Sequence, residues 1–254
     1  MNIHPTAVIE PGAVLGEGVE VGPHAVIFRH VTIGPRTRIH AGAVIGDLPQ
    51  DLGFKGGDSW VRIGADCVIR EHVTIHRGTK PDTATEVGDG CFLMAGSHLA
   101  HNVVLGRRVI LANAVLLAGY VQVGEGAFIS GNAAAHQFVR IGRLAMIGGL
   151  GAVSKDIPPF CTTRSSTLNG VTGLNVIGMR RAGMDAPTRL AVKRAFALLY
   201  REGLNFRDAA AAIAAQFPDG PAREMADFVT AAKRGLAPFA ARRAGGESME
   251  EVDE

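Results

Sequence analysis

An aliphatic residue returns every six positions along most of the first 153 residues of this 254-residue chain. A period of six fits neither the 3.6-residue period of an α-helix nor the two-residue period of a plain strand. It is typical of a coil with three flat faces, in which each hexad contributes one short strand and successive turns bury one another's aliphatic side chains. The longest unbroken series contains Val87, Leu93, Leu99, Leu105, Leu111, Leu117, Val123, Ile129, Ala135, Ile141, Ile147 and Val153.

Two earlier series carry the same period. One runs from Ile3 to Ile45 and the other from Ile63 to Ile75, so the three series hold twenty-three hexads. The two interruptions contain Gly and Pro, and we expect them to leave the coil as loops at 47–60 and 77–86. The high glycine content, 33 of 254 residues, suits a coil with many tight corners. The sequence therefore predicts a mainly β protein with a parallel β-helix at 1–160.

The pattern after the coil changes to helix signals. Adjacent prolines at 158–159 cannot continue a hydrogen-bonded ladder, and we expect a connection without a clear period at 161–184. A small helical domain is predicted at 185–244, followed by a disordered acidic tail at 245–254. Its three helices are expected to begin at the capping or N-terminal residues Asp185, Asn205 and Pro221 and to end by Gly203, Phe217 and Gly235.

Composition and charge neither exclude nor favour a nucleic-acid or membrane partner. The formal net charge is only +2, and no basic and aromatic pattern indicates nucleic-acid binding. Cys67 and Cys91 occupy inward positions of their hexads, which indicates buried thiols in a reducing cytosol rather than disulfides. The first residues do not resemble a signal peptide, and the most apolar stretch is explained by the hexads, so we expect no stable membrane anchor.

Four histidines near the two loops are the candidates for chemistry. His76, His98, His101 and His136 lie in or beside the coil, and histidine is the side chain that can accept a proton near neutral pH. No serine or cysteine stands beside them in a recognisable nucleophile motif. The sequence therefore favours direct attack by a substrate nucleophile, with one histidine as general base.

Two other functional classes remain open from the residues alone. His72 and His76, with His98 or His101, could bind zinc, because some hexapeptide-repeat proteins are carbonic anhydrases with three histidine ligands. A purely structural β-helix without activity would leave the loops and the histidines unexplained.

Basic residues in the second half of the chain suit an acidic protein partner or a pyrophosphate. They are Arg107, Arg108, Arg140, Arg143, Arg164, Arg180, Arg181, Lys193, Arg194 and Arg201.

Specific motifs narrow the choice. The chain, from residue 1 to about 240, resembles the bacterial UDP-N-acetylglucosamine O-acyltransferases, which perform the first step of lipid A synthesis. The motifs that carry this resemblance are Pro49-Gln50-Asp51-Leu52, the segment from Ile69 to Thr79, His98-Leu99-Ala100-His101, Leu117-Ala118-Gly119, His136-Gln137-Phe138, and Gly173-Leu174-Asn175 followed by Arg180-Arg181.

The resemblance implies a fold, an assembly and a mechanism. The family's β-helix is left-handed and forms a homotrimer in the cytoplasm, with active sites between subunits. By this resemblance, His101 is the general base that deprotonates the glucosamine 3-hydroxyl of UDP-GlcNAc. The hydroxyl attacks an (R)-3-hydroxyacyl thioester on the phosphopantetheine of acyl carrier protein, and the backbone N–H of Gly119 stabilises the oxyanion. No metal and no further cofactor are expected.

The resemblance also assigns binding residues. Gln50, Asp51, His76, His98 and His136 match sugar- and acyl-binding positions. Asn175 and Arg181 match the nucleotide region. Gly149 matches the position that limits the acyl chain, where a missing side chain leaves room for a longer chain.

The chain departs from the family at several positions around the sugar. Asn102 follows the predicted base where some members have Asp, and an amide can orient the ring but cannot stabilise an imidazolium by charge. Tyr120 replaces a common His, and Gly53 replaces a Lys for which Lys55 could substitute; Ile177 and Ala182 replace polar residues near the nucleotide. The acceptor is therefore either UDP-GlcNAc or its 3-amino analogue, which would give an amide product.

Overall fold

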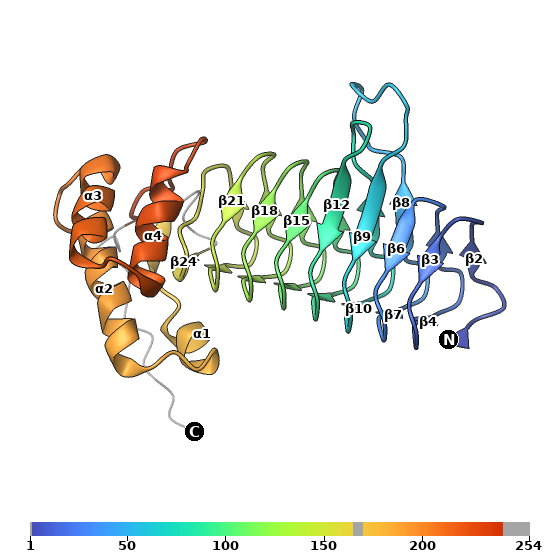
Figure 1. Ribbon diagram of the computed structural model, residues 1–254, viewed down its shortest axis with the longest axis horizontal. Helices are drawn as coiled ribbons and strands as arrows, with labels where there is room; N and C mark the ends of the chain where they lie inside the picture. Colours follow the sequence, from blue (N-terminus) through green and yellow to red (C-terminus); the bar gives the residue numbers. More distant parts are fainter. Residues whose placement is uncertain (1, 165–169, 241–254) are drawn as a thin grey trace.

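The coil predicted from the six-residue period is present. The computed structural model describes residues 2–164 and 170–240. Strands of two to four residues form three parallel sheets that are the flat faces of one elongated coil (Figure 1). The predicted parallel β-helix is therefore confirmed, and twenty-three strands, β1 to β23, match the twenty-three hexads.

The strands of each sheet come from every third hexad. The first sheet holds β1 (Asn2–Ile3), β4 (Glu20–Val21), β7 (Arg38–Ile39), β10 (Val68–Ile69), β13 (Phe92–Leu93), β16 (Ile110–Leu111), β19 (Phe128–Ile129), β22 (Met146–Ile147), β24 (Cys161–Thr163) and β25 (Val171–Leu174). The second holds β2 (Val8–Ile9), β5 (Val26–Ile27), β8 (Val44–Asp47), β11 (Thr74–His76), β14 (His98–Leu99), β17 (Leu116–Leu117), β20 (Ala134–Ala135) and β23 (Ala152–Val153). The third holds β3 (Val14–Leu15), β6 (Val31–Ile33), β9 (Trp60–Ile63), β12 (Ala84–Val87), β15 (Val104–Leu105), β18 (Gln122–Val123) and β21 (Arg140–Ile141).

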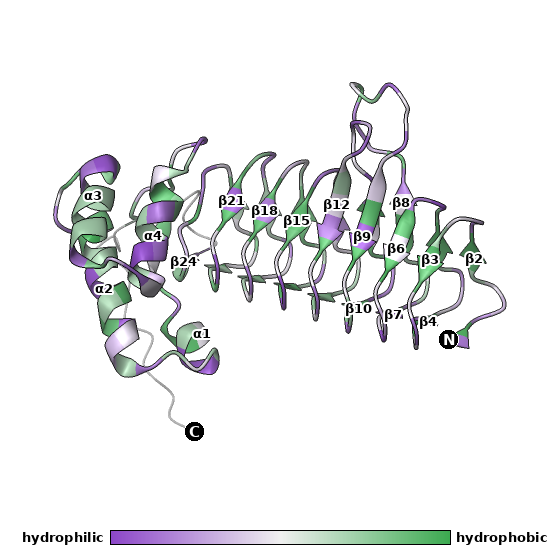
Figure 2. Cartoon of the chain, in the orientation of Figure 1, coloured by the Kyte–Doolittle hydropathy of each residue, from purple (hydrophilic) through white to green (hydrophobic). Residues whose placement is uncertain are grey.

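The core is a column of the inward aliphatic side chains. Leu99 pairs with Ile75 on one side and with Leu117 on the other, so residues one turn apart stack directly. Every inward residue from Val21 to Val153 is buried, whereas Ile3 in the first turn is 42% exposed because it has a neighbour on one side only. Figure 2 shows the hydrophobic residues that β3, β6 and β15 contribute. Cys67 and Cys91 are buried free thiols, as predicted.

The corners of the coil bring distant residues into line. The second residue of each corner commonly has a left-handed φ; Asn102, Tyr120 and Phe138, which follow β14, β17 and β20, have φ values of 60°, 61° and 66°. Because one turn separates these corners, their residues form a column along the edge between the second and third sheets.

Two loops leave the coil at this same edge (Figure 1). They span 48–59 and 77–83, slightly shorter than predicted, because Trp60 pairs with Ala84 and extends the third sheet into both interruptions. The loops are tied together: the Ser59 hydroxyl donates to the Gly78 carbonyl at 2.6 Å, and the Arg77 guanidinium donates to the Gly57 carbonyl at 3.0 Å. They therefore form one unit above the column of corners.

The segment after the coil is more ordered than the sequence predicted. Within the predicted connection, β24 extends the first sheet, β25 pairs with it in antiparallel fashion, and the short helix α1 (Val176–Arg181) follows. The predicted connection therefore contains two strands and a helix, because β24 can pair with β22 although the hexad pattern has ended. Residues 165–169 and the predicted tail at 245–254 lie outside the described residues.

Three helices pack together at this end of the coil. They are α2 (Ala186–Tyr200), α3 (Phe206–Gln216) and α4 (Gly220–Thr230). Asp185 and Asn205 cap α2 and α3 as predicted, each accepting a backbone N–H from the first turn. The predicted end of the third helix at Gly235 was wrong, since the chain leaves α4 after Thr230 and returns to the coil, where Leu236 forms a bridge with Asp156. No helix in the described ranges has both the length and the apolar character needed to cross a bilayer.

Candidate functional site

A cavity of roughly 540 Å³ lies where the two loops meet the column of corners. The first loop supplies predicted binding residues, the second loop closes one side, and three successive corners form the floor and wall. The structure therefore brings Gln50, Asp51 and His101 together, as predicted. The full lining is Gln50, Asp51, Gly53, Thr79, Lys80, His101, Tyr120, Gln137 and Phe138.

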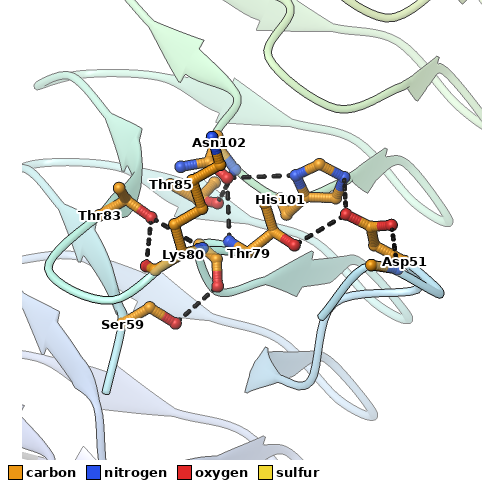
Figure 3. A network of polar contacts seen from close by, with 10 residues as sticks. Asp51, Ser59, Thr79, Lys80, Thr83, Thr85, His101 and Asn102 are labelled. Carbon is orange, nitrogen blue, oxygen red and sulfur yellow. Dashed lines mark hydrogen bonds and ion pairs between the residues drawn. The ribbon is translucent and has the colours of Figure 1, made fainter. Parts of the chain in front are cut away.

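The hydrogen bonds of His101 fix which ring nitrogen is free. His101 Nδ1 lies 3.1 Å from Asn102 Oδ1, and the same oxygen accepts the backbone N–H of Thr79 at 2.9 Å (Figure 3). Since an N–H can only donate, the Asn102 atom must be the oxygen, and His101 Nδ1 must carry the hydrogen that points at it. In the neutral ring Nε2 then keeps its lone pair, which is the state that a general base requires.

Asp51 approaches that free nitrogen from the first loop. Its Oδ2 lies 3.8 Å from His101 Nε2. The backbone N–H of Gly53 and the hydroxyl of Thr79 both donate to the carboxylate, each at 2.8 Å, and these hydrogen bonds hold the pKa of Asp51 below its usual value. An ionised carboxylate therefore stands beside Nε2 of His101.

Gly119 makes the close approach of the ring possible. A Cβ at this position would lie 2.6 Å from His101 Nε2 and 2.5 Å from Cε1, which no side chain can accept. Its N–H takes part in none of the hydrogen bonds found among the described residues. This is normal for the first residue of a corner, since Pro11 and Pro23 stand at the same hexad position and have no N–H at all. Gly119 thus offers a spare donor next to the histidine.

His76 and His98 form a separate pair on the second sheet. Their rings meet edge to face with centroids 4.8 Å apart, and His98 Nδ1 is 2.7 Å from the Thr74 hydroxyl. Burial lowers the pKa of His98 to about 4, and burial also lowers the pKa of His76. His76 Nδ1 is buried without a hydrogen-bond partner. Both rings are thus neutral, and of the four histidines only His101 lines the cavity.

Protonation of His98 provides a prediction. Its pKa is about 4 in the folded chain against 6.5 for a free histidine, so the unfolded chain binds the extra proton first as the pH falls. Stability is expected to decrease between about pH 6.5 and pH 4, and to be unaffected by this group above that range. The direct measurement is an NMR titration of the His98 ring. Titration near pH 6.5 would contradict the burial argument.

The remaining predicted residues lie elsewhere on the chain. His136 is exposed beside the cavity, and only its neighbours Gln137 and Phe138 line it. Asn175 and Arg181 line a second cavity of roughly 910 Å³ between α1 and the first sheet. Within one chain the structure does not bring Asn175 and Arg181 together with His101.

Asn175 has a structural role that the sequence did not predict. Its Oδ1 accepts the N–H of Gly178 and so caps α1, and its Nδ2 donates to the Leu144 carbonyl at 2.8 Å. A Cβ at Gly149 would make only ordinary contacts, since the nearest atom, the Gly131 carbonyl oxygen, would lie 3.5 Å away. Among residues 2–164 and 170–240, no three His, Cys, Asp or Glu side chains are grouped so as to hold a metal ion.

Sequence reasoning missed the role of Thr79, although this residue ends one of the quoted motifs. It also did not predict that Lys80, Gln137 and Phe138 line the cavity with Tyr120. Tyr120 stacks on Phe138 with ring centroids 4.9 Å apart and meets the His101 ring at 5.2 Å. The signal for this aromatic wall was available, because residues eighteen positions apart occupy successive corners.

Comparisons with known proteins agree on one family. Residues 156–237 match the family model described as UDP N-acetylglucosamine O-acyltransferase, domain 2, and residues 84–119 match the bacterial transferase hexapeptide model. The curated acyl-[acyl-carrier-protein]--UDP-N-acetylglucosamine O-acyltransferase of Sinorhizobium fredii is 40% identical over 91% of this chain and 92% of its own length. Its counterpart from Synechocystis sp. is 49% identical over 70% of this chain, an alignment that spans 64% of that protein.

A solved structure extends the likeness to three dimensions. The UDP-N-acetylglucosamine acyltransferase of Bacteroides fragilis superposes with a TM-score of 0.84 at 37% identity, covering 92% of this chain and 98% of that one.

Proposed function

This chain belongs to the UDP-N-acetylglucosamine O-acyltransferases, and from that premise we propose how its residues carry out acyl transfer. Its fold is the left-handed parallel β-helix. The enzyme moves an acyl chain from acyl carrier protein to UDP-GlcNAc, the first step of lipid A synthesis. The observation that supports the catalytic proposal best is the locked tautomer of His101, whose free Nε2 faces the cavity between Asp51 and Gly119.

The reaction follows from these positions. Nε2 of His101 takes the proton of the glucosamine 3-hydroxyl while the oxygen attacks the thioester carbonyl carbon. The spare N–H of Gly119 donates to the oxyanion of the tetrahedral intermediate. The intermediate collapses, the C–S bond breaks, and the imidazolium returns its proton to the leaving sulfur. The products are the 3-O-acyl sugar nucleotide and the free thiol of the carrier protein.

The donor supplies the activated bond. A thioester needs no further activation for attack by a hydroxyl that a base deprotonates, so the proposed reaction requires no metal and no cofactor besides the phosphopantetheine of the carrier. Gln50 and Asp51, in the cavity, are proposed to bind the sugar. His76, His98 and His136, on the adjoining second sheet, are proposed to line the sugar and acyl positions.

The complete site is proposed to need a second copy of the chain. Asn175 and Arg181 lie in a cavity separate from His101, so a nucleotide held by both groups must bridge two subunits. Outward residues of the first sheet give the faces for such contacts, because they form an apolar column; they are Val68, Phe92, Ile110, Phe128 and Met146. The expected homotrimer would cover this column.

The test of the proposed function uses the purified chain. It is given acyl carrier proteins that bear 3-hydroxyacyl chains of different lengths, with UDP-GlcNAc or its 3-amino analogue as acceptor, and products are identified by mass spectrometry while bound metal is assayed. Transfer to UDP-GlcNAc without stoichiometric zinc is expected. Preference for the 3-amino sugar would change the assigned product to an amide. No transfer, with zinc bound to the protein, would support the alternative of a zinc-dependent carbonic anhydrase.

Gly149 gives a prediction about chain length. Because only ordinary contacts surround a Cβ at this position, Gly149→Met is expected to fold and to place a side chain in space that the acyl chain would otherwise occupy. The preferred acyl chain should become shorter, as measured by the ratio of kcat/KM values across the donor panel. An unchanged chain-length profile in a folded variant would refute the assignment of Gly149 as the position that limits the acyl chain.

A further inference from the structure

Asn102 leaves His101 without a negative charge at Nδ1. The amide oxygen holds the tautomer, but a neutral group cannot balance the imidazolium that forms when Nε2 takes a proton. The carboxylate nearest to the ring is Asp51, on the opposite side. Asp51 is fixed by Thr79, the residue that also fixes Asn102 (Figure 3).

We infer that Asp51 is the counter-charge for the His101 imidazolium, and that Thr79 is the positioning residue that sets both the tautomer and this carboxylate. The inference rests on the proposed role of His101 as general base. It assigns to the first loop the electrostatic function that the residue after the histidine cannot perform in this chain.

The geometry suits a charge that acts only after proton transfer. The 3.8 Å between Asp51 Oδ2 and His101 Nε2 exceeds a hydrogen bond, so the lone pair remains open to a substrate hydroxyl. Once Nε2 is protonated, its N–H faces an ionised carboxylate. The interaction is only partly screened, because the side chains of His101 and Asp51 are 11% and 34% exposed. Lys80 is a cation in the same cavity, and Lys55 on the first loop acts electrostatically on Asp51.

Thr79 links the two sides of the ring. Its backbone N–H donates to Asn102 Oδ1 at 2.9 Å, and its hydroxyl donates to Asp51 Oδ2 at 2.8 Å. The residue is only 8% exposed, and it belongs to the loop that Ser59 fastens to the first loop through the Gly78 carbonyl. One residue on a fixed loop, through its backbone N–H and its hydroxyl, therefore sets the distance between base and carboxylate.

The first experiment moves the charge from one side of the ring to the other. Asp51→Asn is expected to lower kcat roughly 10- to 100-fold, because a nearby charge no longer offsets the imidazolium. Adding Asn102→Asp to that variant returns a carboxylate at Nδ1, keeps the oxygen that accepts from Thr79, and should recover at least about tenfold in kcat. A loss confined to KM, with no recovery in the double variant, would mean that Asp51 only binds sugar and would overturn the inference.

The second experiment tests the hydroxyl of Thr79 independently of the shape of its side chain. Thr79→Val keeps the branched side chain and the backbone N–H but removes the donor to Asp51, whereas Thr79→Ser keeps the donor. We expect kcat to fall about tenfold or more in the valine variant and to stay within about threefold of wild type in the serine variant, with equal thermal midpoints. Equal kcat in the valine variant and wild type, or equal impairment of both variants, would refute the positioning role.

His101→Ala distinguishes a failure of the proposed general base from a failure of the counter-charge assignment. If this variant keeps the wild-type rate, the proposed base itself is wrong. If it is inactive and the double variant shows no recovery, the base stands and only the counter-charge assignment fails.

Discussion

Replacing His101 by alanine is expected to lower the rate of acyl transfer by about 10²- to 10⁴-fold, the usual contribution of a general base. The variant removes the only group in the cavity whose tautomer leaves a lone pair facing the acceptor. The loss should appear in kcat, measured at saturating donor and acceptor. Because the ring is held by Asn102 and packs against Tyr120 rather than in the coil's core, the variant is expected to fold.

An exposed histidine from a distant corner provides the matched control. His24 has a left-handed φ of 57°, and His24→Asn suits that backbone because asparagine tolerates this region. Wild-type activity is expected there. Wild-type activity in a folded His101→Ala variant would remove the base from the mechanism.

Gly119→Ala is expected to impair catalysis strongly, although it adds only one methyl group. Its Cβ would lie 2.5 to 2.6 Å from two atoms of the His101 ring, so the ring must leave its position beside the spare N–H. A displacement of about 1 Å can cost on the order of 10²-fold in rate. We expect a loss of that size in kcat with little change in the thermal midpoint.

The expectation that this variant folds comes from the coil itself. Ala41, Ala65 and Ala95 stand at the same hexad position as Gly119, so alanine is compatible with the backbone of this corner. The strain therefore falls on His101 alone. An active, folded Gly119→Ala variant would show that the ring does not need its present position.

Periodicity predicted the coil because burial repeats with it. The inward residues of twenty-three hexads could be named in advance, since each turn buries the turn before it. The same logic failed after Val153: β24 continues the first sheet and α1 begins at a cap formed by Asn175, but neither follows the six-residue period. The third helix was predicted too long because a sequence does not show that Leu236 will return to the coil.

The cavity was predictable only in part. Its position in the hexad placed His101 at a corner of the coil. The residues that define its chemistry, Asp51 and Thr79, come from the two loops, and the six-residue period does not predict the conformation of a loop. The proximity of Asp51 to Nε2, and the two hydrogen bonds of Thr79, became visible only with the loops in place. The contact between Tyr120 and Phe138, in contrast, was predictable, because the two residues are one turn apart and therefore stack.

Each residue of the coil stacks on the residue eighteen positions later. This register also determines which insertions and deletions the coil can accommodate. Deleting a full turn between His101 and Gly149 would keep every later residue on its face and bring Gly149, the proposed limit of the acyl chain, nearer to His101 by about 4.8 Å, the spacing of adjacent strands. Deleting a single hexad would instead rotate all later residues by one face and carry Gly149 to another side. Apart from loops that leave the coil at a corner, insertions and deletions are therefore expected only in whole turns. With Gly149 as the proposed limit of the acyl chain, a whole turn added or removed between His101 and Gly149 would change the acyl length that the enzyme selects.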